Sequence, residues 1–325
     1  MEHSTNSGRD LEIAVLVPCL NEEHGIATVV EDFRRALPGA TIYVYDNGST
    51  DRTREVASAA GAVVRQEPRR GKGNVVRRMF ADVEADVYLM VDGDGTYDSA
   101  TAPAMIRRLL GEHLDMVIAT RLDAGGEIFR KGHKAGNQGF AKLIAALFGP
   151  QLTDVFSGYR ALTRRFVKSF PGYSSGFEIE TELSIHALSI RIPMVEMAAP
   201  FGHRAAGSES KLSTTRDGIR ILRIVFYFLK EVRPLLFFSA VALIFALTSL
   251  VLAYPVFVTY LETGLVPRFP TAILATGIML LAFLSAACAL ILDSVAAMRW
   301  VAKRNAYLAE PLTPQSLAAR FEIQR

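Results

Sequence analysis

Two carboxylates separated by a single glycine follow directly after a short apolar segment of the chain. The segment reads V-Y-L-M-V, and Asp92, Gly93 and Asp94 come next. Along an extended backbone, residues i and i+2 lie on the same side, so the two acids can converge on one point. Carboxylate oxygens suit Mg²⁺ or Mn²⁺, ions that commonly hold phosphate groups. A polar turn is the alternative, because Asp-Gly is frequent in turns.

Other polar clusters follow earlier apolar segments. Asp46 closes the segment T-I-Y-V-Y-D and precedes N-G-S-T-D, in which Asp51 can act as a ligand contact or as a helix cap. Lys72 lies between two glycines at the start of a helical pattern, where free backbone N–H groups can form a phosphate cradle. The chain has neither the Walker A pattern nor a G-x-G-x-x-G turn after its first apolar segment, which disfavours the two commonest nucleotide-binding folds.

The elements that must position these residues alternate in type. Apolar runs of strand type lie at 13–18, 41–46, 62–66, 87–92 and 116–120, and helical patterns lie at 25–37, 51–60, 73–81 and 102–110. Such alternation predicts an α/β fold with a mostly parallel sheet and flanking helices. Ligands of such sheets bind beyond the C-terminal ends of the strands, which is where the polar clusters lie.

Two long uncharged stretches distinguish the C-terminal part of the chain. They run from about 235 to 258 and from about 271 to 294, within a segment at 234–298, and each is long enough to cross a bilayer. We expect a transmembrane hairpin; two buried core helices are the alternative. Residues 215–233 combine a basic stripe with apolar residues. They predict an amphipathic helix in the membrane interface or packed on the soluble domain.

Charge around the hairpin predicts its orientation. Basic residues precede the first span and follow the second, so both ends are expected in the cytoplasm by the positive-inside rule. The first residues have no apolar core of a signal peptide. We therefore expect a disordered segment at 1–10, a cytosolic domain at 11–214, a cytosolic tail at 299–325, and a multi-pass protein of the inner (plasma) membrane.

Taken in order, VPCLNEE, YDNGSTD, GKG and DGD resemble the family 2 glycosyltransferases with the GT-A fold. The resemblance continues through DVFSGYR at 154–160, FEIETEL at 177–183 and the segment at 201–211. With the basic amphipathic segment and the hairpin, the chain is similar to the polyprenyl-phosphate glycosyltransferases, which include dolichol-phosphate mannose synthases and bacterial polyprenyl-phosphate glucosyltransferases. The resemblance covers residues 11 to 305.

The resemblance implies a donor site for a nucleotide diphosphate sugar at the first strand ends. The implied donor residues are Pro18, Asn21, Glu22, Asp46, Lys72, Asp92 and Gly93. Asp92 and Asp94 would bind Mg²⁺ or Mn²⁺, which neutralises the departing diphosphate. Thr96 stands where many relatives carry a glutamine ligand, so the rest of the coordination is open.

On the acceptor side, the resemblance implies a polyprenyl phosphate held by basic residues. The matching positions are Arg121, Arg130, Arg204 and Lys211, each of which can also be a solvated surface charge. Asp94, Arg121 and Asp154 make up the expected catalytic set. Asp154 either orients the acceptor or a basic side chain, or acts itself as a general base. Glu178 and Glu182 share one helix face, with Glu180 turned away, and are the expected acids of this side.

The function implied is inverting transfer of a sugar to polyprenyl phosphate for cell-envelope glycan assembly. A UDP-sugar is favoured, and GDP-mannose is the other donor considered. One alternative is transfer to a saccharide or other hydroxyl acceptor, and a second is a non-catalytic sugar-nucleotide-binding membrane protein. The expected partners are the nucleotide sugar, undecaprenyl or dolichyl phosphate, the lipid membrane and further copies of the chain, but not nucleic acid.

Overall fold

A computed structural model describes residues 11–123, 152–202, 226–227, 229–312 and 321. The chain forms two compact units, residues 1–214 with 303–325 and residues 215–302. Several predictions lie outside the described residues. They concern the segment 1–10, most of the amphipathic segment 215–233, and Arg130, Arg204 and Lys211.

A seven-stranded sheet forms the centre of the first unit, with strand order β3-β2-β1-β4-β6-β5-β7. The strands are β1 (Ile13–Cys19), β2 (Thr41–Asp46), β3 (Val63–Gln66), β4 (Val87–Met90), β5 (Met116–Asp123), β6 (Arg160–Thr163) and β7 (Met194–Phe201). Only β6 runs antiparallel to its neighbours β4 and β5 among the pairings between these described strands. The predicted mostly parallel sheet is therefore confirmed, whereas the reversed β6 was not predicted.

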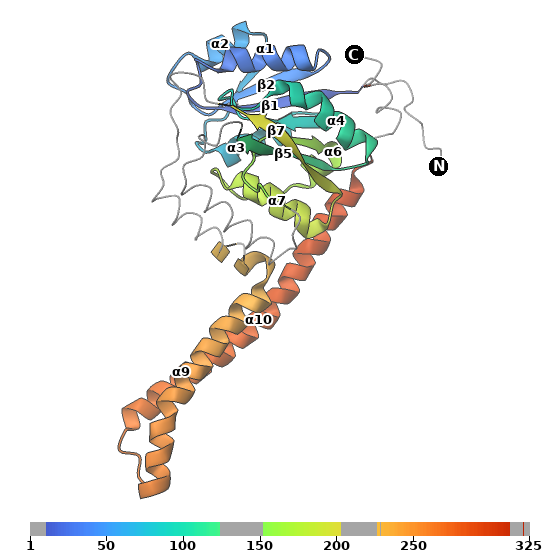
Figure 1. The fold of residues 1–325 in the computed structure, drawn as a ribbon. Coiled ribbons are helices and arrows are strands. Elements are labelled where there is room, and N and C mark those ends of the chain that lie inside the picture. The colour runs from blue at the N-terminus through green and yellow to red at the C-terminus, as the bar shows by residue number, and fades with distance from the viewer. Residues whose placement is uncertain (1–10, 124–151, 203–225, 228, 313–320, 322–325) are drawn as a thin grey trace. The chain divides into compact units, whose positions relative to one another are not determined.

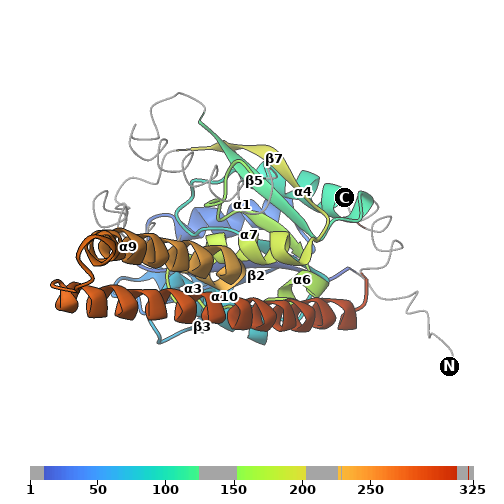
Figure 2. The ribbon, with the colours of Figure 1, turned by 90° about the horizontal axis from the view of Figure 1, so that it is seen from below.

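Helices cover both faces of the sheet (Figure 1). They are α1 (Ile26–Ala36), α2 (Thr53–Ala59), α3 (Lys72–Asp82), the short η1 (Ser99–Thr101), α4 (Ala102–Gly111), α6 (Arg164–Ser169) and α7 (Ile179–Ile190). On one face α1 and α4 pack with β1, β4 and β5 into a buried apolar cluster. Helices α3, α6 and α7 lie on the opposite face, seen from below in Figure 2.

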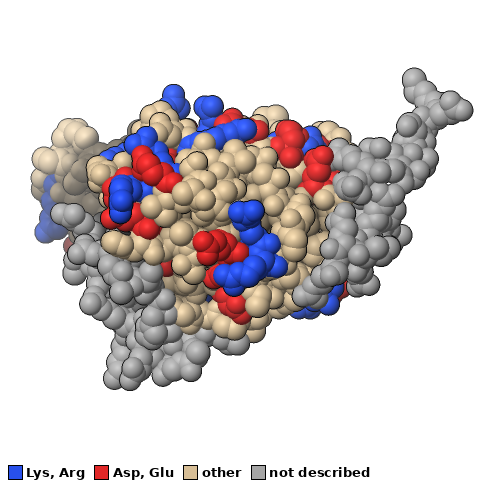
Figure 3. Space-filling view, turned by 90° about the horizontal axis from the view of Figure 1, so that it is seen from above, with Lys and Arg blue, Asp and Glu red and all other residues tan. Residues whose placement is uncertain are grey.

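Helix α1 shows why these segments fold as they do. Its buried residues Ile26, Val29, Val30 and Phe33 recur at helical spacing and form one apolar stripe toward the sheet. Its outer side carries charges of both signs, including an ion pair between Arg35 and Asp32 at 2.8 Å. Figure 3 shows the same intermixing of acids and bases over the face of the protein that it views.

The register of the parallel strands brings the polar clusters to one edge of the sheet. Cys19 at the end of β1 lies beside Asp46 at the end of β2, and Leu16 pairs with Met90 of β4. Because parallel strands point the same way, the residues that follow them emerge together. The edge predicted to bind ligands is therefore assembled from the segments after β1, β2 and β4.

The second unit contains two long apolar helices, α9 (Pro234–Thr263) and most of α10 (Phe269–Ala309). Only 6% of the most apolar window of α9 and 17% of that of α10 is buried within the protein. A core helix of a soluble domain would be mostly buried, so the alternative of two core helices is disfavoured. By length and composition both helices are candidate membrane spans, as predicted.

Small side chains line the contact between these two helices. Ala275, Ala282 and Ala289 follow one another at seven-residue intervals on α10 and are each at most 5% exposed. Ser249 of α9 donates a hydrogen bond to the carbonyl oxygen of Ala275 at 2.7 Å. Small residues at such a seam let two helix backbones approach closely, as membrane helix pairs require.

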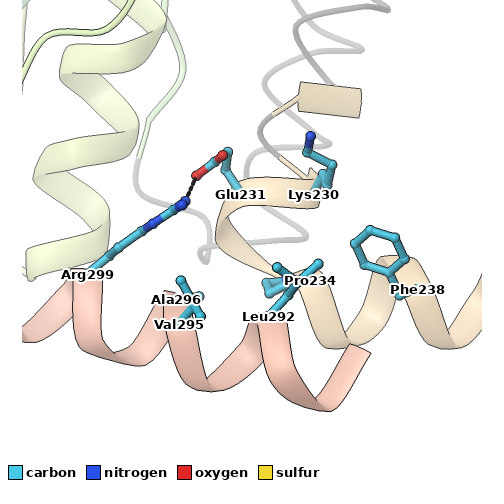
Figure 4. A pocket seen from close by; sticks show the side chains of 8 residues that line it. All are labelled: Lys230, Glu231, Pro234, Phe238, Leu292, Val295, Ala296 and Arg299. Carbon is cyan, nitrogen blue, oxygen red and sulfur yellow. Dashed lines mark hydrogen bonds and ion pairs between the residues drawn. The ribbon is translucent and has the colours of Figure 1, made fainter. Parts of the chain in front are cut away.

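A cavity of about 200 Å³ lies within the second unit (Figure 4). Its walls are mainly apolar and include Pro234, Phe238, Leu292, Val295 and Ala296. Its charged residues are Lys230 and an ion pair between Arg299 and Glu231. All these residues belong to the hairpin unit, whereas the predicted donor-site residues belong to the other unit.

The C-terminal end of α10 belongs to the first unit, where it contacts Asp115 just before β5 and residues of α6 and α7. The Tyr307 hydroxyl donates to Asp115 Oδ2 at 2.6 Å, and Arg304 donates to the Ile190 carbonyl oxygen at 2.8 Å. The Arg165 guanidinium lies 4.1 Å from the centre of the Tyr307 ring and donates to Asp115 as well. Residues 304 and 307, within the segment expected to be a cytosolic tail, therefore contact the folded domain.

Tyr307→Phe tests this attachment. The substitution leaves Asp115, which is 2% exposed, without one of its donors, and hydrogen bonds to charged groups contribute about 2 kcal/mol. We expect the melting temperature of the domain to fall by roughly 4–8 °C, measured by circular dichroism of the full chain in detergent. Tyr173→Phe, at a residue 65% exposed, is the control and should leave it unchanged. Equal effects would show that the Tyr307 hydroxyl is not a stabilising contact.

Candidate active site

Side-chain hydrogen bonds join the segments that follow β1 and β2. The Asn21 backbone N–H donates to Ser49 Oγ at 2.8 Å, and the Thr50 N–H donates to Asn21 Oδ1 at 2.8 Å. Asp46 is 1% exposed and accepts the backbone N–H groups of Gly48 and Ser49. Two of the predicted donor residues, Asn21 and Asp46, thus shape the loops at this edge.

The remaining predicted residues of this edge lie close by. Glu22 is buried, and its N–H donates to Thr53 Oγ1 at 2.9 Å; Pro18 is half-buried in β1. Asp51 accepts the N–H of Thr53, the first residue of α2, at 3.0 Å. Asp51 thus contacts the first N–H of α2 from the residue before the N-cap Arg52. Hydrogen bonds from Thr53 and Glu23 outweigh the opposing effect of burial and lower the pKa of Asp51.

Asn47 connects this edge to the glycine-rich segment, a role that was not predicted. Its side-chain N–H groups donate to the carbonyl oxygens of Glu67 and Arg69 at 2.9 and 2.8 Å. Its Oδ1 accepts the Gly71 N–H at 2.7 Å. A buried Asn with all these bonds made fixes the backbone that leads into α3. The sequence offered one signal for this role of Asn47, namely its position directly after Asp46 at the end of β2.

The glycines beside Lys72 serve a close approach of backbone. The Gly73 N–H donates to the Ser175 carbonyl oxygen at 3.0 Å. A Cβ at Gly71 would lie 2.0 Å from that oxygen, and one at Gly73 would lie 2.1 Å from the Ser174 carbonyl oxygen. The N–H groups of Gly71 and Gly73 are both engaged by protein acceptors. The prediction that they form a phosphate cradle is therefore contradicted for these two groups.

Lys72 itself bridges two carboxylates. Its Nζ contacts Asp92 Oδ1 and lies 2.5 Å from Glu180 Oε1. Burial works to lower the pKa of Lys72, but the charges of Asp92 and Glu180 outweigh it and raise the pKa. For Glu180 the effect of burial prevails: it raises the pKa of this carboxyl group, although the positive charge of Lys72 works to lower it. The site holds a charged lysine between two acids.

The expectation for the acids of α7 is corrected by this geometry. Glu180 was expected to be turned away, but it pairs with Lys72. Both oxygens of Glu182 accept backbone N–H groups, from Tyr173 at 2.7 Å and Ser174 at 2.8 Å. Glu178 takes the N-cap position of α7. Helix α7 is buried around nearly its whole circumference. The spacing of its acids along the helix could therefore not show which of them lies beside Lys72.

The Asp-Gly-Asp segment lies beyond the end of β4 at Met90, so strand alternation does not set its side chains. Asp94 is 7% exposed, and its Oδ1 accepts the Thr96 hydroxyl at 2.7 Å. Thr96, considered as a metal ligand, therefore orients Asp94. Gly158 packs against Asp92, since a Cβ at Gly158 would lie 2.6 Å from Asp92 Oδ2.

Two carboxylates at this edge fit a hard divalent cation. The described residues contain no group of three or more His, Cys, Asp or Glu side chains arranged as a metal site. Mg²⁺ often takes only one or two protein carboxylates and completes its shell with substrate phosphates and water. Asp92 and Asp94 therefore fit a cation that arrives with a diphosphate.

Arg121 and Asp154 form a two-pronged ion pair. Arg121 Nε lies 2.7 Å from Asp154 Oδ2, and Arg121 Nη2 lies 2.7 Å from Asp154 Oδ1. Burial works to lower the pKa of Arg121, but the hydrogen bonds and charge of Asp154 outweigh that effect and raise the pKa. Asp154 is held in turn, because its N–H donates to Glu196 Oε1 at 3.0 Å. Of the roles left open for Asp154, this contact is the one that orients a basic side chain.

Arg160 connects the Asp154 segment to α7. Its side chain is fully buried and donates to the carbonyl oxygens of Ser157, Val155 and Glu180, each at 2.9 Å. It also donates to Ser184 Oγ at 2.9 Å. Burial lowers the pKa of Arg160 to about 10, which leaves it charged at neutral pH. This residue had been recognised only as part of a short motif.

Comparison with known proteins gives a consistent result. Glycosyl transferase family 2 matches residues 14–170. Protein RfbJ of Shigella flexneri is 54% identical over 135 residues, which are 41% of this chain and all of RfbJ. A dolichyl-phosphate hexose transferase of Haloferax volcanii is 30% identical over 211 residues, covering 65% of this chain and 90% of that protein. The resemblance found in the sequence is confirmed.

Solved structures share the fold of the first unit. Glucosyl-3-phosphoglycerate synthase from Mycobacterium tuberculosis, in complex with Mn²⁺, UDP and glucosyl-3-phosphoglycerate, superposes with a TM-score of 0.55 at 25% identity. The match covers 68% of this chain and 79% of that structure. The predicted GT-A type of fold, a mostly parallel mixed sheet with flanking helices, is therefore confirmed.

Gly73→Ala tests the close packing at the start of α3. The new Cβ would clash with the Ser174 backbone, and overpacking of this kind costs about 1–3 kcal/mol. We expect a lower denaturation midpoint in urea. Gly111→Ala at the end of α4 is the control, because nothing lies within 4 Å of its Cβ position. It should be neutral or slightly stabilising, and an equal loss in both variants would contradict the packing described.

Proposed function

We propose that this chain, which belongs to glycosyl transferase family 2, transfers a sugar from a nucleotide diphosphate sugar to a polyprenyl phosphate in a membrane. One combination carries the proposal: a strand-end site with buried acids and bases, and two apolar candidate membrane helices, lie in the same chain. The name of the Haloferax dolichyl-phosphate hexose transferase supports the lipid phosphate as acceptor.

On the donor side, Asp92 and Asp94 are proposed to bind Mg²⁺ or Mn²⁺. The cation, when bound, neutralises charge on the nucleoside diphosphate as it leaves. Thr96 holds the Asp94 carboxylate in place through its hydroxyl. Lys72 lies beside Asp92 and adds a positive charge where the diphosphate would bind. A UDP-sugar is the favoured donor, supported by the UDP in the mycobacterial synthase, and GDP-mannose is the other donor considered.

On the acceptor side, chemistry at a phosphate makes a strong base unnecessary. A phosphate monoester has a second pKa of about 6 and is mostly a dianion at neutral pH. Its oxygen attacks C1 of the sugar, the bond from C1 to the diphosphate breaks, and the anomeric configuration inverts. Arg121, held by Asp154, is proposed to bind the lipid phosphate and offset its repulsion from the donor. Arg130, Arg204 and Lys211 are proposed for the same task from their motif positions.

The proposal includes a location. Both helices would cross the plasma membrane, with the catalytic domain and both termini in the cytoplasm, as the basic flanks favour. The lipid phosphate would then meet the site at the cytosolic face. Exposed apolar side chains on α9 and α10 also leave surface for assembly with further copies of the chain.

A turnover assay tests the proposed reaction. Purified protein in detergent would receive short-chain polyprenyl phosphate, Mn²⁺ or Mg²⁺, and a panel of UDP- and GDP-sugars. We expect lipid-linked sugar that EDTA removes and that Asp94→Asn lowers at least about 100-fold, since charge stabilisation at a reacting centre is commonly of this size. Asp32→Asn, at a partly exposed position of α1 that pairs with Arg35, is the control. Turnover only with a saccharide or with 3-phosphoglycerate would contradict a lipid phosphate acceptor.

Asp154→Asn tests the acceptor side separately. Without the carboxylate, Arg121 loses its fixed orientation, so we expect KM for the lipid phosphate to rise about tenfold while KM for the donor changes little. Glu112→Gln, which removes the exposed partner of Arg108, is the matched control. If Asp154 were instead a general base, kcat would fall with KM unchanged, and that result would contradict the orienting role.

A further inference from the structure

Lys72 lies at an unfavourable place for a cation. It is the first residue of α3, and the positive end of a helix dipole disfavours a nearby ammonium group. Its side chain is also only 11% exposed. Two carboxylates compensate for both effects, Asp92 at 28% side-chain exposure and Glu180 at 5%. The position of Lys72 therefore depends on partners that come from two other segments of the fold.

The two partners differ in freedom. Asp92 is the more exposed of the two, and in the proposed function it must turn toward the nucleotide diphosphate and its cation. Glu180 lies on a helix whose backbone is fixed, because the Glu180 carbonyl oxygen accepts from Arg160 at 2.9 Å and from Ser184 at 3.0 Å. In the proposed function Asp92 would leave the lysine, whereas these bonds fix the backbone from which the Glu180 side chain extends beside it.

Glu180 also has unused hydrogen-bonding capacity. Its Oε2 is buried and has no hydrogen-bond partner in the described part of the protein. A buried carboxylate oxygen without a partner is unusual and calls for an explanation. An ammonium group has three N–H donors, so the N–H that Lys72 now donates to Asp92 can be donated to Glu180 Oε2 instead, beside the existing contact with Oε1. An exchange of partners would satisfy both groups.

We propose that Glu180 is a positioning residue that retains Lys72 at the donor site when Asp92 turns to the ligand. The inference rests on the proposed function and adds a residue to its donor site. Leaving a buried ammonium unpaired is strongly unfavourable, so without Glu180 the lysine would hold Asp92 and compete with the incoming cation. With Glu180 present, Asp92 becomes free to bind while the lysine stays paired beside the diphosphate.

Glu180→Gln tests the exchange by removing the charge and keeping the size. Asp92 then becomes the single carboxylate partner of Lys72, and we expect the dissociation constant of Mn²⁺ in the presence of UDP or GDP to rise about tenfold. In a Lys72→Met background no ammonium competes for Asp92, so adding Glu180→Gln should have no further effect. The non-additivity of the double variant measures the coupling through the lysine.

The measurement is a binding titration on the full chain in detergent, with no sugar donor and no lipid phosphate. Free Mn²⁺ is followed by electron paramagnetic resonance for the wild type, both single variants and the double variant, and circular dichroism checks that each is folded. If Glu180→Gln fails to fold, Glu180→Asp replaces it: the charge stays, but the side chain is one methylene shorter and draws the carboxylate away from Lys72, so the same direction of change is expected. Glu112→Gln, far from the lysine in sequence and exposed, is the charge-matched control.

Each outcome decides a separate point. A tenfold loss that disappears in the Lys72→Met background supports the exchange. A loss that persists without Lys72 would show that Glu180 contacts the ligand directly, and unchanged binding would show that it has no role; either result overturns the inference alone. If the wild type fails to bind Mn²⁺ both in the presence of UDP and in the presence of GDP, the proposed function fails and the inference fails with it.

Discussion

The buried guanidinium of Arg160 is the constraint on which the site depends. A cation without exposure to water is tolerated only when its N–H groups are paired. Arg160 meets that requirement with carbonyl oxygens from the segment after Asp154 and from α7. Both segments must therefore meet the guanidinium in one arrangement. That arrangement places Asp154 beside Arg121 and Glu180 beside Lys72.

The resulting site divides its charges between two clusters. Lys72 begins α3, Asp92 follows β4 and Glu180 lies in the first turn of α7; these three residues form the cluster proposed to bind the donor. Arg121 of β5 pairs with Asp154, which precedes β6, on the side proposed for the acceptor. Pairing each base with an acid keeps both clusters stable without ligands. In the proposed function, these bases would meet the two anionic substrates already held in position.

Local patterns in the sequence were sufficient for β1 to β5, for the helices between them, for the two long apolar helices and for the polar edge, but not for β6 and β7. Alternating apolar runs and helical spacing depend on neighbouring residues, so β1, β2, β4 and α9 could be predicted. The reversed direction of β6 and the facing of Glu180 depend on contacts across the fold. The bond between Tyr307 and Asp115 joins residues 192 positions apart, which no local pattern reveals. The two glycines beside Lys72 were interpreted as a phosphate cradle. The sequence does not show that the backbone of Ser174 and Ser175, far along the chain, packs against them.

The central claim is that an ionised lipid phosphate, and not a hydroxyl group, accepts the sugar. Phosphorus and proton NMR of the purified product tests it most directly. The account predicts a phosphodiester between C1 of the sugar and the lipid phosphate, with the anomeric configuration inverted relative to the donor. A glycosidic bond to a hydroxyl group, or a phosphodiester with retained configuration, would contradict it.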